Sequence, residues 1–281
     1  MSQKKGNTIV TRYKINSGGG MPQKIALVTD LHDRSGQEAL ELLRKEKPDL
    51  IAAAGDFMER CDEENGIITS AEMERWQEVT SRHRAMYKII KTVTAVGRKF
   101  WGEQQQRGAG LKFLIQAAKI APVCYSVGNH EWYFLPEDYR KFKENHIILL
   151  DNEDIEFITD SGRVLIGGLS TRYDLDWLKR FGQKKGTKIL LCHHPEYYKK
   201  FIRGTGLDQF DLVLSGHVHG GQWRIGTCGI LAPGQGFFPE YCYGMYDKKL
   251  IISGGLANTA GVPRFGNPKE IVIIEQEKER N

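Results

Sequence analysis

The stretch KIALVTDLHDRSGQEALELLRKEKPDLIAAAGD, residues 24–56, determines the fold class. Its apolar runs at 24–29 and 49–54 have the length of buried strands, and Leu40 and Leu43 between them have helical spacing. Pro48 ends this helix because proline cannot continue the backbone hydrogen bonding. A strand, a helix and a second strand in this order predict two parallel strands joined by a right-handed crossover.

Short apolar runs of the same kind recur along the rest of the chain. They lie at residues 8–15, as an edge strand, and at 123–127, 164–166, 188–191, 211–214, 250–252 and 271–274. This pattern predicts a layered α/β sandwich. No Pro- or Ser-rich linker divides the chain, so we expect residues 1–281 to form a single domain.

A helical insertion over about 69–121 interrupts the strands. Apolar residues recur at steps of three and four from Trp76 to Val93, and Gly108 and Gly110 then precede a second short helix around Leu111 to Ala118.

Composition narrows the class of protein. The 281 residues include 40 basic and 35 acidic side chains, a formal net charge of +5, and 40% are hydrophobic, which argues against disorder. No apolar run reaches the roughly 18 residues of a membrane span, and the N-terminus lacks the apolar core of a signal peptide. The five cysteines are scattered without a C-x-x-C pair, which argues against a disulfide framework and a thiolate zinc site. We therefore expect a cytoplasmic protein.

Five polar motifs follow predicted strands. They are Asp30-Leu31-His32, Gly55-Asp56, Gly128-Asn129-His130-Glu131, His193-His194-Pro195 and Gly216-His217-Val218-His219-Gly220-Gly221. Each alone has an ordinary interpretation, such as a turn aspartate or a histidine at a helix start. Their joint occurrence at strand ends predicts that all five converge on one rim, where α/β proteins bind ligands.

The residue types in these motifs are those that bind divalent metals. Carboxylate, imidazole and amide oxygen suit zinc, manganese or iron rather than thiolate-seeking metals. D-x-H and H-x-H spacing places both side chains on the same side of an extended segment. Asp56 could bridge two metals through its two carboxylate oxygens.

This ordered set of motifs, from Asp30 to His219, resembles the calcineurin-like metallophosphoesterase superfamily. The run GHVHGGQ and the tail at 254–274 are similar to its bacterial YkuE/YaeI-like branch. The resemblance implies a four-layer α/β/β/α sandwich with a dinuclear centre. It assigns the first metal to Asp30, His32, Asp56 and His219, and the second to Asp56, Asn129, His193 and His217. His194 holds a variable position and is not assigned as a ligand.

One position departs from the family pattern. Glu59 stands where the family commonly has aspartate. Asp33 and Cys61 replace two glycines of the serine/threonine protein phosphatases, which disfavours that group.

We therefore expect a metal-dependent phosphohydrolase that favours phosphodiesters. In the expected reaction a metal-bridging hydroxide attacks phosphorus, and His130 is the catalytic residue near the leaving group. The diester preference comes from the resemblance alone. Alternatives are a phosphomonoesterase or nuclease with the same site, or a catalytically silent protein-binding scaffold. Arg34, Arg60 and Arg172 could bind phosphate oxygens, although a solvated surface arginine is the commoner role.

The excess positive charge is concentrated in one segment. Residues 81–101 contain six basic side chains and no acidic one, whereas the rest of the chain has 34 basic and 35 acidic residues. The favoured interpretation is a cap helix with a solvated basic face; the alternative is peripheral contact with an anionic membrane. A nucleic-acid partner is disfavoured, because a net charge of +5 is too small for a chain of this size to require one.

Overall fold

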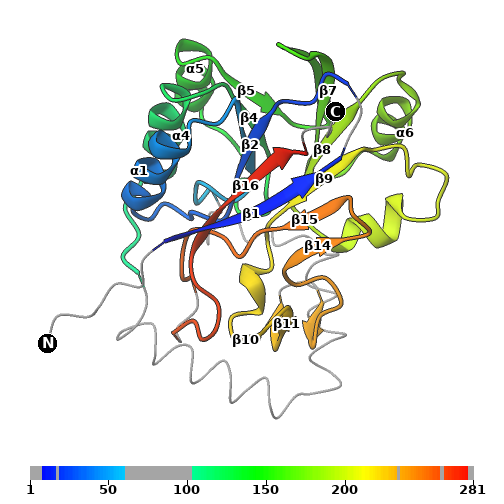
Figure 1. Ribbon diagram of the computed structural model, residues 1–281. Coiled ribbons are helices and arrows are strands. Elements are labelled where there is room, and N and C mark those ends of the chain that lie inside the picture. Colours follow the sequence, from blue (N-terminus) through cyan, green and yellow to red (C-terminus); the bar gives the residue numbers. More distant parts are fainter. Residues whose placement is uncertain (1–7, 17–18, 61–102, 233–234, 260–262, 278–281) are drawn as a thin grey trace, which may run out of the picture.

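The computed structural model describes residues 8–16, 19–60, 103–232, 235–259 and 263–277, and two six-stranded sheets form its centre (Figure 1). The first sheet has the order β1 (Ile9–Ile15), β16 (Glu270–Gln276), β2 (Lys24–Val28), β3 (Leu50–Ala54), β4 (Val123–Ser126) and β5 (Ile147–Leu150). The second has the order β14 (Gly244–Tyr246), β15 (Leu250–Ile252), β9 (Leu212–Ser215), β8 (Lys188–Cys192), β7 (Gly162–Leu169) and β6 (Glu153–Thr159).

Both sheets are mixed. Strands β2 to β5 are parallel, whereas β16 runs antiparallel to β2 and parallel to β1. In the second sheet β7, β8, β9 and β15 are parallel, and the edge strands β6 and β14 are antiparallel to their neighbours. Two antiparallel hairpins complete the described strands: β10 (Arg224–Ile225) with β11 (Cys228–Gly229), and β12 (Leu231–Ala232) with β13 (Gly236–Phe237).

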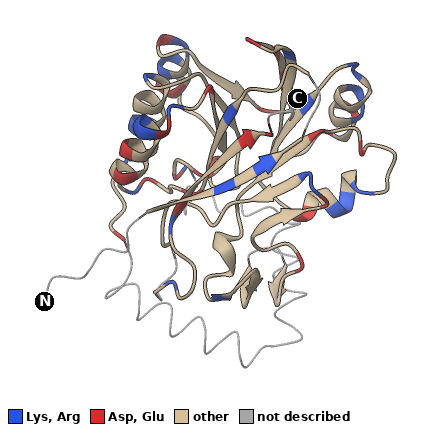
Figure 2. Cartoon of the chain, in the orientation of Figure 1, with Lys and Arg blue, Asp and Glu red and all other residues tan. Residues whose placement is uncertain are grey.

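Helices cover the outer face of each sheet (Figure 1). The first sheet packs against α1 (Gln37–Glu46), α4 (Ala109–Ala118) and α5 (Pro136–Glu144). The second packs against α6 (Leu175–Gln183) and the short η1 (Tyr198–Ile202), and a second short element, η2 (His219–Gly221), follows β9. The charged residues of the first helix layer lie along its outer surface, while the strands between the layers are largely uncharged (Figure 2).

The alternation of side chains along each strand produces three cores. On β2, Ile25 and Leu27 face the second sheet, whereas Ala26 and Val28 face the helices. All four side chains are fully buried. Such strands are apolar on both faces because each sheet is covered on both sides, which gives the four-layer α/β/β/α sandwich.

The predicted fold class is confirmed, as are the predicted strands and the parallel pairing of β2 with β3. The helix expected around Leu111 to Ala118 is α4, and its apolar face packs into the core of the first helix layer. Residues 69–102 of the expected insertion, which include the basic segment 81–101, lie outside the described residues. The single-domain organisation stays a prediction.

Two further features bear on the sequence predictions. Among the described cysteines, Cys124, Cys192, Cys228 and Cys242 form no disulfide, and Cys124 and Cys192 are core residues as expected. Within the described ranges, we find no helix with the length and apolar character needed to span a membrane.

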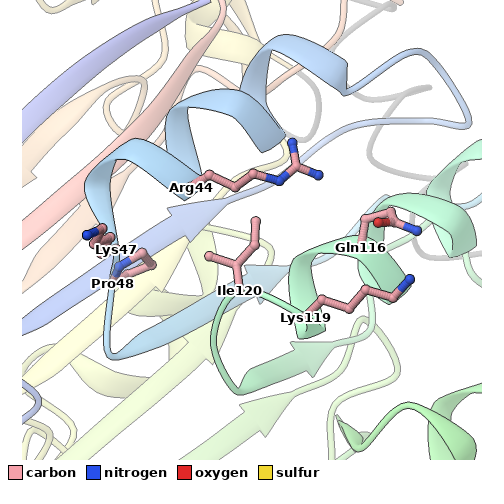
Figure 3. A pocket seen from close by; sticks show the side chains of 6 residues that line it. All are labelled: Arg44, Lys47, Pro48, Gln116, Lys119 and Ile120. Atoms are coloured by element: carbon pink, nitrogen blue, oxygen red, sulfur yellow. The ribbon is translucent and has the colours of Figure 1, made fainter.

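A pocket of about 370 Å³ lies between α1 and α4, at the end of the first sheet where strands β3 and β4 begin (Figure 3). Its lining residues are Arg44, Lys47, Pro48, Gln116, Lys119 and Ile120. The predicted metal ligands Asp56 and Asn129 follow the other ends of these two strands, so the pocket is separate from the predicted site.

Candidate metal centre

The loops after β2, β3 and β4 in the first sheet and after β8 and β9 in the second carry the predicted ligands. The structure brings six of them together in two groups whose ligand atoms lie within 4.8 Å of one another. One group is Asp30, His32 and His219, and the other is Asp56, His193 and His217. Asn129 joins the second group, because its Oδ1 lies 3.2 Å from His193 Nε2.

Asp56, a member of the second group, also approaches the first. Its Oδ2 is 3.1 Å from His193 Nε2 and 3.6 Å from His32 Nε2. Its Oδ1 accepts a 2.8 Å hydrogen bond from the backbone N–H of His130. Asp30 Oδ1 is 3.8 Å from His219 Nε2, which connects the second sheet to the first. The one aspartate that the sequence marked as a bridge therefore contacts imidazoles of both groups.

Strained backbone conformations occur at these same residues. Asp30, His32, Asp56, His217 and His219 all have positive φ, between 47° and 69°. Outside glycine, this left-handed region costs on the order of 1–3 kcal/mol per residue, and it persists where the surrounding structure imposes it. Five of the seven predicted ligands share this conformation, which also occurs outside the site, for example at Lys47 and His146.

Two glycines allow the loops to approach each other. A Cβ on Gly128 would lie 2.2 Å from Asp56 Oδ1, and a Cβ on Gly55, where φ is +88°, would lie 2.4 Å from His193 Nδ1. Any side chain at either position would displace a predicted ligand. The glycines beside Asp56 and Asn129 thus have a direct steric role in assembling the site.

Hydrogen bonds orient the imidazoles for metal binding. His193 Nδ1 donates to the carbonyl of Ala54 at 2.7 Å, so Nε2, which lies 3.1 Å from Asp56 Oδ2, is the nitrogen that would bind a cation on losing its proton. His32 Nδ1 pairs with Glu59 at 2.9 Å, and its buried Nε2 has no hydrogen-bond partner. A buried polar atom without a partner is costly unless a ligand satisfies it. These donors therefore fit divalent cations.

Electrostatics divide the histidines into two kinds. Burial lowers the pKa values of His217 and His219 well below normal, and neighbouring histidines lower them further. Burial favours the neutral form of His130 and His193 as well, but acidic neighbours together outweigh it. Asp56, Glu59 and Glu131 raise the pKa of His130 to about 9. Asp56, Asp30 and the carbonyl of Ala54 raise the pKa of His193 to about 10. Burial raises the pKa of Asp56, but His193 and His130 outweigh this and lower it well below normal. Burial also raises the pKa of Asp30.

His130 lies at the open side of the site. Its side chain is 36% exposed, whereas those of His32 and His193 are buried. Glu59 holds it through a 2.8 Å contact between Oε2 and Nδ1 of the imidazole, while the other Glu59 oxygen binds His32. The pKa of Glu59 is lowered: burial opposes this, but both histidines outweigh it. Nε2 of His130 faces Asp56 Oδ2 at 3.9 Å.

Glu131 was quoted in a motif but given no role, and the structure shows that it joins two loops. Its Oε2 accepts from the backbone N–H groups of Asp56 at 3.0 Å and Gly128 at 2.7 Å. Its Oε1 accepts from Phe57 at 2.6 Å and Met58 at 3.0 Å. Burial and the charge of Asp56 raise the pKa of Glu131 to about 7, whereas its hydrogen-bond donors oppose the shift. One buried carboxylate thereby fixes the position of Asp56 relative to Asn129.

The three predicted phosphate-binding arginines have different surroundings. Arg34 lies at the site, with Nη1 3.5 Å from Glu59 Oε1. Arg172 is exposed, and its guanidinium lies 5.8 Å from the ring centre of Trp132. Arg60 is buried and makes a bidentate ion pair with Asp138 on α5, at 2.8 and 3.0 Å. This ion pair engages the guanidinium of Arg60, which is therefore not available to bind a phosphate oxygen.

Two more residues pack around the ligands. Arg264 Nη2 lies 3.3 Å from His219 Nδ1, so the loop after residue 263 returns to the site. His194 contacts Thr171 Oγ1 at 3.0 Å and Glu196 Oε1 at 3.3 Å, beside the ring of His217. The Gly/Pro-rich sequence around Arg264 is compatible with a loop that returns to the rim, and the structure has that loop at His219.

Comparison with known proteins establishes the family to which the chain belongs. The profile of the calcineurin-like phosphoesterases matches residues 23–221, which span every predicted ligand. The chain belongs to this family, as its motifs indicated. Membership supports a metal-dependent phosphohydrolase that uses divalent metals, and the groups of ligand atoms described above agree with this.

Full-length relatives occur in Bacillus subtilis. The chain is 26% identical over 279 residues to "Uncharacterized protein YpbG", covering 96% of this chain and 88% of that protein. It is also 26% identical to "Uncharacterized metallophosphoesterase YkoQ" from the same organism, covering 94% of this chain and 88% of that protein. A Campylobacter jejuni protein, "Uncharacterized metallophosphoesterase Cj0846", is 33% identical over 53% of this chain and 41% of its own length. The YkuE/YaeI-like branch stays a prediction.

Proposed function

We propose that this chain hydrolyses phosphodiesters at a dinuclear metal centre. The dinuclear part rests on one observation. The buried donors form two groups, and Asp56, a member of the second group, also approaches His32 of the first. Asp30, His32, Asp56 and His219 would hold one cation; Asp56, Asn129, His193 and His217 would hold the other. Carboxylate, imidazole and amide donors admit manganese, zinc or iron.

The proposed reaction divides between the metals and the protein. When bound, two divalent cations polarise phosphoryl oxygens and lower the pKa of a coordinated water. Glu59 fixes the ring of His130 through Nδ1, which leaves Nε2 to donate a proton to the leaving oxygen. Arg34 is placed at the same side of the site, where its guanidinium could bind a phosphoryl oxygen.

The preference for diesters rests on the resemblance to the YkuE/YaeI-like branch, and a phosphomonoesterase or nuclease would use the same ligands. Metal-free protein should therefore be titrated with Mn²⁺, Fe²⁺, Zn²⁺, Ni²⁺ and Co²⁺ against bis(p-nitrophenyl) phosphate and p-nitrophenyl phosphate. We expect activity to rise with two equivalents of metal, and the diester to be turned over faster.

A matched set of variants tests the site itself. His217→Ala should lose both activity and one equivalent of bound metal, whereas Glu137→Ala on the exposed surface of α5 should retain both. Full activity in His217→Ala would exclude the proposed centre. A single equivalent of metal at saturation in the native protein would exclude its dinuclear form.

A further inference from the structure

A row of large apolar residues is exposed beside the metal centre. Trp223 begins it, four residues after His219, and forms a β-bridge with Phe265. On the other side, the backbone N–H of Ile230 donates to the carbonyl of Trp223, and that of Phe238 donates to the carbonyl of Ile230, each at 2.9 Å. Backbone contacts therefore make these four residues successive neighbours, Trp223 beside Phe265 and Ile230, and Ile230 beside Phe238.

The isolated β-bridge places Trp223 beside Phe265. The register of β10 with β11 and of β12 with β13, continued by one residue, places Ile230 beside Trp223 and Phe238 beside Ile230. Ile225 lies on β10, two residues after Trp223. All five side chains are exposed: the exposed fraction is 71% for Phe265, 43% for Trp223, 37% for Ile230, 78% for Phe238 and 80% for Ile225. We call this set the apolar face.

The intervening residues project the other way. Arg224 is buried, and Arg264 contacts His219. In residues 220–239 Arg224 is the sole charged residue, so the apolar face carries no charge from its own strands. The strands around β10 and β11 are correspondingly almost free of charged side chains (Figure 2). A contiguous exposed apolar surface of this kind marks an interaction site in a soluble domain.

We propose that the apolar face inserts into the interfacial region of a membrane that contains anionic lipids. Trp, Phe and Ile on hairpin turns and loops are side chains that enter the headgroup boundary, and Trp is favoured there. The sequence adds charge complementarity. Residues 81–101, which lie outside the described part of the chain, contain six basic and no acidic side chains, and such a segment is attracted to anionic lipid headgroups.

Such binding would place the metal centre next to the bilayer. His219 is a predicted ligand, and both Trp223 and the loop carrying Phe265 extend directly from its surroundings. A phosphoester at the membrane surface would then reach the site without leaving the lipid. The binding itself does not depend on the proposed reaction and is tested without it.

Vesicle co-sedimentation tests the proposal. The metal-loaded full chain is mixed with vesicles of phosphatidylcholine alone or with about 30% phosphatidylglycerol. The native protein should pellet with the anionic vesicles, and the double variant Ile225→Ser/Phe238→Ser should bind at least about tenfold more weakly. Ile158→Ser is the matched control, because Ile158 is 72% exposed on the edge strand β6, and it should bind like the native protein.

Hydrolysis of soluble bis(p-nitrophenyl) phosphate should be unchanged in the double variant, which separates membrane binding from folding and chemistry. The single variants Ile225→Ser on β10 and Phe238→Ser in the bend after β13 should each show an intermediate loss. Equal binding of the native protein and the double variant would overturn the proposal. Failure of the native protein to pellet would overturn the proposal as well. It would mean that a second copy or another part of the chain covers the apolar face.

Discussion

The two ends of the first sheet carry polar residues under opposite conditions. At the end where β2, β3 and β4 terminate, buried carboxylates and imidazoles form groups whose ligand atoms lie within 4.8 Å of one another. At the end where β3 and β4 begin, Arg44, Lys47 and Lys119 surround the pocket of Figure 3 but are exposed. These cations lie at the C-terminal ends of α1 and α4, where the helix dipole favours positive charge.

The comparison shows that charge alone does not define a site. The cations around the pocket have a sufficient explanation in the helix ends they occupy. The buried donors at the other end have an unpartnered imidazole nitrogen and loops held together by Glu131. Such an arrangement is costly to fold and is retained where a ligand is bound. The predictions below should therefore separate the two ends by the size of their effects.

The largest effect is expected for Asp56→Ala. Removing the residue shared by both groups eliminates a donor from each proposed cation, and turnover should fall by at least about 10³-fold. Metal analysis of the purified variant should show less than one equivalent. Substitution of Lys119 by Ala at the pocket is the contrasting variant, and it should keep full activity and metal content.

His130→Ala should come next. Loss of a general acid costs about 10²–10⁴-fold, and the loss should grow as the leaving group becomes more basic. The measurement is kcat over a series of aryl diesters, with metal content determined in parallel. An equal loss for every leaving group, with metal intact, would remove His130 from the proton-donating role.

Glu131→Gln tests whether the carboxylate that joins the loops sets the metal site. An amide can present only one oxygen to the four N–H donors, so two donors lose their acceptor and unfolding free energy should drop by about 2–4 kcal/mol. Metal affinity should fall by about 10–100-fold. Calorimetric metal titration and urea unfolding give both values. Glu137→Gln on α5 should change neither, and an unchanged metal affinity in Glu131→Gln would show that the loops are held in another way.

The smallest effect is expected at the pocket, from Lys47→Gly. Lys47 ends α1 in a left-handed conformation, with φ of 49°, where glycine is the favoured residue. Glycine should raise the unfolding free energy by about 0.5–1 kcal/mol and leave turnover unchanged. A loss of activity in this variant would give the pocket a function and weaken the contrast between the two ends.

Sequence reasoning reached the fold because strand length, helical spacing and strand-end motifs are local. Residues 24–29 and 49–54 became β2 and β3, and the D-x-H and H-x-H motifs came together at one rim. The edge strand β6 and the helices α5 and α6 were not predicted. The segment of α5, PEDYRKFKE, has Phe142 as its sole buried apolar residue, so it carries no clear apolar stripe.

The parts of the site that the sequence did not reveal depend on distant partners. Arg60 followed a motif and looked available for phosphate, but its partner Asp138 is 78 residues away. Glu131 stands 75 residues from the backbone of Asp56 that it binds. The apolar face depends on pairing Phe265 with Trp223, and neither residue has a distinctive local pattern. Tertiary contacts alone define these roles.

The pairing of β1 with β16 has a consequence for the order of synthesis. Ile9 lies in register with Glu270, so strands separated by about 260 residues are direct neighbours, and β16 also fills the position beside β2. During translation the first sheet must wait for residues 270–276, and until they emerge β2 presents an unpaired edge. The loop bearing Asp30 and His32 leaves that same strand. A nascent chain therefore holds most of its metal-binding residues well before it can complete the sheet that positions them.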